Sequence, residues 1–228
     1  MKIVGFGDSF VWGSEIQNNQ YGGRSWPALA ADMLGASYET LAVPGCGNDL
    51  IAQQIYSYFS DHSAEKTLAV INWTWTQRWD FYIVSNETWI TVGPTCVPEK
   101  LAKTVELTQS HRIIDFYRDY ANSSLLWNKF RNLTTIFACQ QFMNLKGIRR
   151  VETYMDYHLL DQTWHCPDYV QQLQSQVKIG LRDWEGKNFV DWSHSHGYAV
   201  TKERNHPLAE AHRAAADFWL PEYSKYFR

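Results

Sequence analysis

The stretch Lys2-Ile3-Val4-Gly5-Phe6-Gly7-Asp8-Ser9-Phe10 opens with a short apolar run and passes through glycine into an Asp-Ser pair. A short apolar run that stops at glycine is typical of a buried strand ending in a tight turn. Open α/β folds bind ligands at the carboxyl ends of their strands, so this turn would place Ser9 beside a ligand. Ser9 is therefore a candidate nucleophile if a base reaches its hydroxyl. The simpler alternative is that Asp8 or Ser9 only caps the following helix.

A candidate base lies near the other end of the chain, in Glu203-Arg204-Asn205-His206-Pro207. Histidine takes up and returns a proton near neutral pH, which suits His206 to this role. Its second ring nitrogen needs an acceptor that fixes the tautomer. Glu203, three residues earlier, is close enough in a turn to supply that acceptor, and Asp191 is the alternative acid. His212 is a competing base, but it falls within the last predicted helix.

Together the two motifs resemble the SGNH or GDSL hydrolases, which combine an N-terminal Gly-Asp-Ser with a C-terminal acid-x-x-His in one triad. The resemblance extends through both ends of the chain, with weaker matches between them. It implies an α/β three-layer α/β/α sandwich with a roughly five-stranded parallel sheet in the flavodoxin-like order. It also implies a serine hydrolase with Ser9 as nucleophile, His206 as base and Glu203 as acid, although the family usually has aspartate at this last position.

Ester cleavage also needs hydrogen-bond donors for the oxyanion of the tetrahedral intermediate. The backbone N–H of Ser9 is one natural donor. The resemblance implies a second N–H from a glycine after the second strand, where Gly45 matches best and Gly47 is the alternative. Both glycines are also explained if they only permit the backbone angles of a turn.

The family's third donor is an asparagine side chain in a Gly-x-Asn-Asp sequence after the third strand, and this chain lacks that sequence. It has Ile71-Asn72-Trp73-Thr74-Trp75 instead, which aligns Thr74 with the asparagine and leaves Asn72 as the alternative donor. Arg78 is a candidate for binding an anionic substrate group. The candidates for substrate contact near these turns are Asp8, Trp73, Trp75 and Arg78.

Alternating strand and helix patterns follow the opening strand, as a parallel sheet covered on both faces requires. Further strands are predicted at 38–43, 68–72, 149–155 and 189–192, and helices at 26–34, 49–59, 111–145 (with a break near 122–124), 167–178 and 207–219. The polar segment 11–23 is expected to form a loop near the site. Residues 80–110 predict an insertion, with a small hairpin flanking the site, within a single domain spanning 1–228.

Length and composition limit the possible functions. A chain of 228 residues is about one domain, and a net charge of −3 offers no electrostatic case for nucleic acid binding. The sequence contains no long apolar segment, so neither a signal peptide nor a membrane-spanning helix is expected. The four cysteines are scattered without a Cys-x-x-Cys pair, which predicts reduced thiols in a cytoplasmic protein with no metal and no cofactor.

The expected partner is a small-molecule or glycan ester, with no nucleic acid and no membrane. The 11 tryptophans should be mostly core, but an aromatic ring near a cleft can stack on a sugar. We therefore favour cleavage of a short acyl or acetyl group from a sugar or small alcohol. Two alternatives stay open: an acyltransferase using the same triad, and a non-catalytic glycan-binding protein on the same scaffold, because fold alone does not establish activity.

Overall fold

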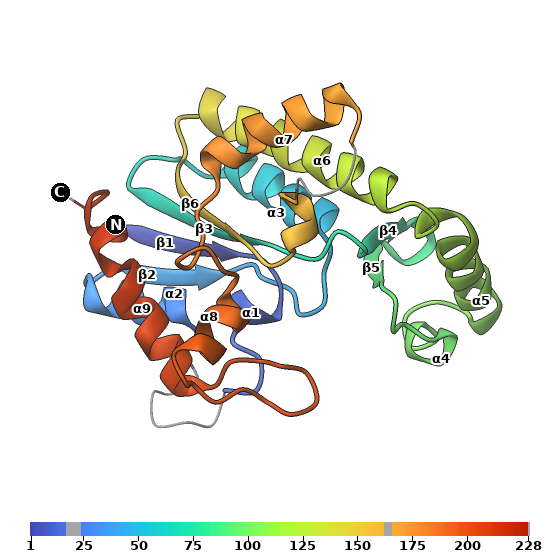
Figure 1. Cartoon of the computed structure of the whole chain (residues 1–228), viewed down its shortest axis with the longest axis horizontal. Helices are drawn as coiled ribbons and strands as arrows, with labels where there is room; N and C mark the ends of the chain where they lie inside the picture. The colour runs from blue at the N-terminus through green and yellow to red at the C-terminus, as the bar shows by residue number, and fades with distance from the viewer. Residues whose placement is uncertain (17–23, 162–165, 228) are drawn as a thin grey trace.

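Four parallel strands form the centre of the molecule (Figure 1), in a computed structural model that describes residues 1–16, 24–161 and 166–227. Their order across the sheet is β2-β1-β3-β6. The strands are β1 (Lys2–Phe6), β2 (Ser37–Thr40), β3 (Thr67–Trp73) and β6 (Arg149–Tyr154). The order reverses at β1, with β2 on one side and β3 on the other. Parallel sheets bind ligands outside the carboxyl ends of the strands at such a reversal, and Ser9 follows β1 there.

Helices cover both faces of this sheet, as the parallel arrangement requires (Figure 1). One layer contains α3 (Asn48–Asp61), α6 (Leu125–Leu145) and α7 (Asp168–Gly180). The other contains α1 (Ser9–Trp12), α2 (Trp26–Met33), α8 (Phe189–Ser195) and α9 (Ala209–Ser224). Strand β3 is buried throughout, with Ala69 and Ile71 in the first apolar core and Leu68 and Val70 in the second. The predicted α/β/α sandwich is confirmed.

The sheet has four strands rather than about five, because the segment 189–192 is helical. The side chain of Asn188 accepts the N–H of Asp191 at 2.9 Å and caps α8, and Phe189 and Trp192 pack into the second core. Beside β6, a single parallel bridge between Glu152 and Leu181 stands where a fifth strand would lie.

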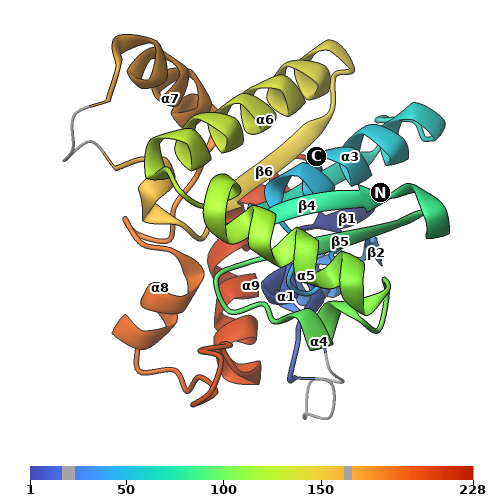
Figure 2. The same cartoon turned by 90° about the vertical axis from the view of Figure 1, so that its right-hand side faces the viewer.

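An antiparallel hairpin and short helices lie beyond the carboxyl ends of the strands, opposite the two chain termini (Figures 1 and 2). They surround an apolar core of their own, to which Ile83, Val92 and Tyr117 contribute. The elements are β4 (Trp79–Ile83), the 3₁₀ turn η1 (Val84–Asn86), β5 (Thr88–Val92), α4 (Pro98–Leu101), α5 (Leu107–Phe116) and the π-helical turn η2 (Tyr117–Ala121). A hairpin therefore occupies the segment predicted to contain one.

The predicted helix 111–145 is divided near the expected break. Ser124 caps α6 by accepting the N–H of Trp127, after the π-helical turn η2 ends at Ala121. A 3₁₀ turn, η3 (Tyr157–Leu159), follows β6. Part of the predicted loop 11–23, residues 17–23, lies outside the described residues. No helix in the described ranges is long and apolar enough to span a bilayer.

Candidate active site

A tight turn holds Ser9 at the carboxyl end of β1. Gly7 has a φ of 152°, and a Cβ there would lie 2.8 Å from the Val11 side chain and 3.1 Å from the Asn72 carbonyl oxygen. Only glycine fits this position without displacing backbone. Asp8 Oδ1 then accepts the N–H of Phe10 at 3.1 Å, so that α1 begins at Ser9. The alternative role considered for Asp8, capping the following helix, is therefore present, and both Asp8 and Ser9 are buried at the end of the strand.

A short closed loop holds His206 over the same end of the sheet. An antiparallel bridge joins Val200 to Pro207, and the N–H of Thr201 donates to the carbonyl of His206 at 2.9 Å. The N–H of His206 donates in turn to Thr201 Oγ1 at 3.0 Å. Asn205, directly before the histidine, has a φ of 53°. The loop therefore presents the imidazole from a restrained backbone.

The structure brings the two motifs into contact. Nε2 of His206 lies 3.0 Å from Oγ of Ser9, within hydrogen-bond distance. The ring of Phe10 packs edge-on against the imidazole, with centroids 5.2 Å apart and planes at 82°. This contact restricts rotation of the imidazole. Ser9 and His206 therefore have the mutual geometry of a nucleophile and its base.

A carboxylate from the segment after α1 faces the other ring nitrogen. Glu15 Oε1 lies 3.2 Å from Nδ1 of His206 and 3.7 Å from Nη1 of Arg204. The contact falls outside hydrogen-bond angles, so it is electrostatic as it stands, and catalytic hydrogen bonds often align fully only when substrate is bound. Glu15 has a φ of 67°, a conformation that is rare outside glycine and concentrated at functional sites.

The two acids predicted from the sequence lie elsewhere. Glu203 is exposed on its loop, and within the described residues its carboxylate has no contact with His206. Asp191 Oδ2 accepts the hydroxyl of Tyr157 at 2.7 Å, from helix α8. Glu15 therefore replaces both beside Nδ1. No motif marks Glu15 in the sequence, and its place beside His206 is seen only in the structure.

The two predicted glycines differ in whether their N–H groups are available. The N–H of Gly47 donates to Asp80 Oδ1 at 2.9 Å, and Asp80 Oδ2 accepts the N–H of Leu50 at 2.8 Å. Asp80, from β4, thereby caps α3, and its burial raises the pKa of this carboxyl. The N–H of Gly45 has no acceptor among the described residues. The N–H of Ser9 opens α1 and so has no partner within the helix.

Neither predicted third donor is placed to serve an oxyanion. The Thr74 hydroxyl donates to Asp8 Oδ2 at 2.8 Å, which uses its only proton. Asn72 accepts the hydroxyl of Thr153 at 2.8 Å, across the pairing of β3 with β6. Ser9 follows β1, on the opposite side of β3. The Asn72 amide is therefore held toward β6 and away from Ser9, and its Nδ2 has no hydrogen-bond partner among the described atoms.

A cavity of about 360 Å³ opens beside His206. Trp75 and Arg78, two of the residues expected to contact substrate, line it together with Phe10 and Tyr157. Trp73 does not, because it is fully buried in the first core and donates from Nε1 to Glu152 Oε2 at 2.8 Å. Asp8 is also fully buried, and both of its carboxylate oxygens are occupied by protein donors.

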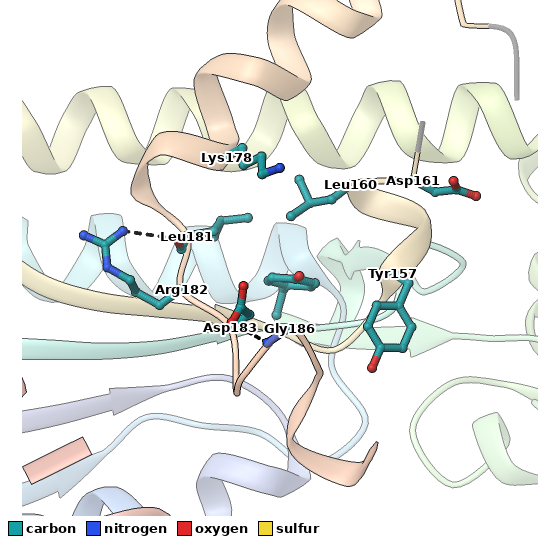
Figure 3. A pocket seen from close by; sticks show the side chains of 9 residues that line it. Tyr157, Leu160, Asp161, Lys178, Leu181, Arg182, Asp183 and Gly186 are labelled. Atoms are coloured by element: carbon teal, nitrogen blue, oxygen red, sulfur yellow. Dashed lines mark hydrogen bonds between the residues drawn. The ribbon is translucent and has the colours of Figure 1, made fainter. Parts of the chain in front are cut away.

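A second cavity of about 370 Å³ is also lined by Tyr157, together with Lys178, Arg182 and Asp183 (Figure 3). Tyr157 lines both cavities, and its hydroxyl is held by Asp191. The candidate base His206 lines the first cavity but not the second. The first cavity is therefore the one next to the candidate Ser9–His206 pair.

His212, the competing base, is a structural residue. Its Nδ1 accepts the N–H of Trp26 at 3.1 Å, at the start of α2. Burial, with a smaller contribution from nearby His206, lowers the pKa of His212 to about 3, so its ring is neutral. The thiol of Cys46 is likewise buried, donates to the Gly7 carbonyl at 3.3 Å, and has a pKa raised by that burial. No cluster of metal-ligating side chains occurs in the described part of the chain.

Comparison with known proteins supports the fold. No protein-family model matches the chain, and no curated protein matches it. Among solved structures, a member of the lipolytic protein G-D-S-L family from Veillonella parvula aligns at a TM-score of 0.53 with 13% identity, over 99% of each chain. The chain has the G-D-S-L fold.

Two esterase structures align to this chain with lower TM-scores. An acetyl xylan esterase from Butyrivibrio proteoclasticus scores 0.48 at 9% identity, over 100% of this chain and 64% of that one. A variant of an acetylxylan esterase from Geobacillus stearothermophilus scores 0.47 at 12% identity, over 97% and 93% of the two chains. At such identities a likeness establishes the fold alone.

Proposed function

We propose that this chain hydrolyses carboxylic esters through an acyl-enzyme formed on Ser9. The observation that carries the proposal is the 3.0 Å approach of His206 Nε2 to Ser9 Oγ, between residues 197 positions apart in the chain. A serine hydroxyl is a weak nucleophile until an adjacent base takes its proton. The position of Ser9 directly after β1, where the strand order of the sheet reverses, supports the same reaction.

In the first half of the reaction, Ser9 Oγ attacks the ester carbonyl while its proton passes to His206 Nε2. The carbonyl oxygen becomes an oxyanion that accepts the N–H groups of Ser9 and Gly45. The intermediate then expels the alcohol, whose oxygen takes the proton from His206. In the second half, water attacks the acyl carbonyl while His206 takes its proton, which forms a second tetrahedral intermediate. That intermediate breaks its bond to Ser9 Oγ and releases the acid, and His206 returns the proton to Oγ.

Glu15 acts in this scheme as the carboxylate that orients the imidazole. Its Oε1 lies 3.2 Å from Nδ1 of His206 and favours the tautomer with the proton on that nitrogen. The bare Nε2 then faces Ser9. When His206 becomes an imidazolium, the negative charge of Glu15 stabilises it. Glu15 thus takes the role that the sequence motif predicts for Glu203.

The cavity favours a short acyl group on a sugar or small alcohol. Its volume of about 360 Å³ is at the lower end of the range for small-molecule sites. The walls combine the aromatic rings of Phe10, Trp75 and Tyr157 with polar side chains that include Asn188 and Arg204. Aromatic faces stack on sugar rings, and the polar groups provide partners for hydroxyls.

The test is hydrolysis of p-nitrophenyl esters, from acetyl to octanoyl, by the wild type and Ser9→Ala. We expect the substitution to abolish turnover, short chains to be preferred, and a fluorophosphonate probe to label Ser9. Ser14→Ala, in the same segment but outside the His206 contact, is the matched control and should retain activity. Turnover that survives Ser9→Ala would overturn the proposal. Acyl transfer to an added sugar acceptor in preference to water would reassign the chain as an acyltransferase.

A further inference from the structure

The guanidinium of Arg78 lies where three of the site's segments meet. Its Nη1 is 2.9 Å from Asp8 Oδ2, next to the nucleophile, and 3.0 Å from the carbonyl oxygen of Cys46, next to Gly45. The same nitrogen is 2.7 Å from Thr74 Oγ1. These contacts place the cation between the turn that holds Ser9 and the turn that holds Gly45.

Arg78 also retains donors that nothing in the described structure uses. All of its hydrogen bonds to described residues involve Nη1, so Nε and Nη2 remain available. The side chain is 20% exposed and lines the cavity beside His206. A guanidinium presents its N–H groups in a fixed plane and stays protonated at every pH of interest. Arg78 therefore has unused donors on a side chain that lines the cavity beside the candidate base.

Thr74 explains why an arginine can occupy this position. Threonine is shorter than the asparagine expected there, and Nη1 of Arg78 lies within hydrogen-bond distance of its hydroxyl oxygen. The guanidinium thus takes up space beyond the threonine side chain. Because the Thr74 hydroxyl already donates to Asp8, the unused donors beside the place where the asparagine amide is expected belong to Arg78.

We infer that Arg78 is the third oxyanion donor of this site, a role that rests on the esterase function proposed above. Its free N–H groups bind the substrate carbonyl oxygen as that oxygen gains negative charge, alongside the N–H groups of Ser9 and Gly45. No proton is transferred, since arginine remains charged throughout. Asp8 holds the guanidinium in place and balances its charge, so the site accepts a neutral ester.

The experiment compares wild type, Arg78→Lys, Arg78→Gln and Ser9→Ala with p-nitrophenyl acetate, a neutral ester. Loss of one oxyanion donor lowers kcat by about 100- to 1000-fold, so we expect Arg78→Gln to lose kcat on this scale with KM within about threefold. Arg78→Lys keeps a cation beside Asp8 and so preserves the fold, and it should lose less. Affinity for phenylboronic acid, which forms a tetrahedral anion on serine, should fall in parallel with kcat.

Adding Thr74→Asn to Arg78→Gln should restore part of kcat, because an amide then returns to the donor position. Unchanged kcat and phenylboronic acid affinity in folded Arg78→Gln and Arg78→Lys, together with inactivity of Ser9→Ala, would overturn this inference and leave the esterase proposal standing. A rise in KM confined to a succinate half-ester would also overturn it, since Arg78 would then bind anionic substrate instead. Activity that survives Ser9→Ala would overturn both.

Discussion

Glu15→Gln is expected to lower kcat/KM for a neutral ester, whereas Glu203→Gln should leave it unchanged. Glutamine keeps the size of the side chain but removes the charge that stabilises the His206 imidazolium. The same substitution is made at both positions, but only Glu15 lies 3.2 Å from the imidazole, whereas Glu203 is the exposed acid that the sequence motif selects. The comparison therefore separates the acid chosen by the tertiary structure from the acid chosen by the sequence.

The size of the effect follows from the distance between the Glu15 carboxylate and the His206 imidazole and from the exposure of both side chains to solvent. Two unit charges 3.2 Å apart attract by about 1.3 kcal/mol at the dielectric constant of water and by about 5 kcal/mol at an effective value of 20. The side chain of Glu15 is 32% exposed and that of His206 is 12% exposed, so solvent screens the pair in part. We expect Glu15→Gln to raise the activation free energy by about 2 to 3 kcal/mol, which corresponds to a roughly 30- to 160-fold decrease in kcat/KM.

The assay is steady-state hydrolysis of p-nitrophenyl acetate by wild type and both variants, with thermal melting to show that each is folded. The effect of Glu15→Gln should fall mainly on kcat, because the imidazolium exists only as the reaction proceeds. A Glu15→Gln enzyme within twofold of wild type would contradict this account. A large loss in Glu203→Gln instead would return the acid to the position predicted from the sequence.

Three further predictions concern the scaffold around the site. The pKa of His212 is about 3 in the folded chain, so below pH 6.5 the unfolded chain binds a proton that the folded chain does not. The free energy of unfolding is therefore unaffected by His212 above pH 6.5 and falls by about 1.4 kcal/mol per pH unit below it. His212→Asn, which keeps an acceptor for Trp26, should flatten this slope in urea titrations from pH 4 to 7. Asp80→Ala removes the cap of α3 and should cost about 1 to 2 kcal/mol in urea denaturation, with lower kcat as the Gly45 turn loosens. Gly47→Ala should lower the melting temperature more than Gly45→Ala, because its Cβ would lie 2.6 Å from Asp80 whereas Gly45 has open space and only the strain of a φ of 83°.

Local sequence patterns were sufficient to predict the structure of segments whose conformation depends mainly on their own residues. The apolar run ending in Gly7-Asp8-Ser9 predicts a strand and turn because glycine is required where the chain passes close to other backbone. The segment 189–192 shows the limit of such reasoning. Its apolar residues fit a strand or a buried helix equally well, and the cap by Asn188 together with packing of Phe189 and Trp192 in the core decides for a helix.

The sequence by itself determined the α/β/α class and pointed to Ser9 and His206, because each stands in a recognisable motif beside a predicted element. Only the tertiary structure decided that Glu15 lies beside His206 and that Arg78 joins the turns of Ser9 and Gly45. Those contacts join segments far apart in the chain, and no local periodicity or spacing encodes them. They depend on how loops at the carboxyl ends of β1, β2 and β3 converge once the sheet has formed.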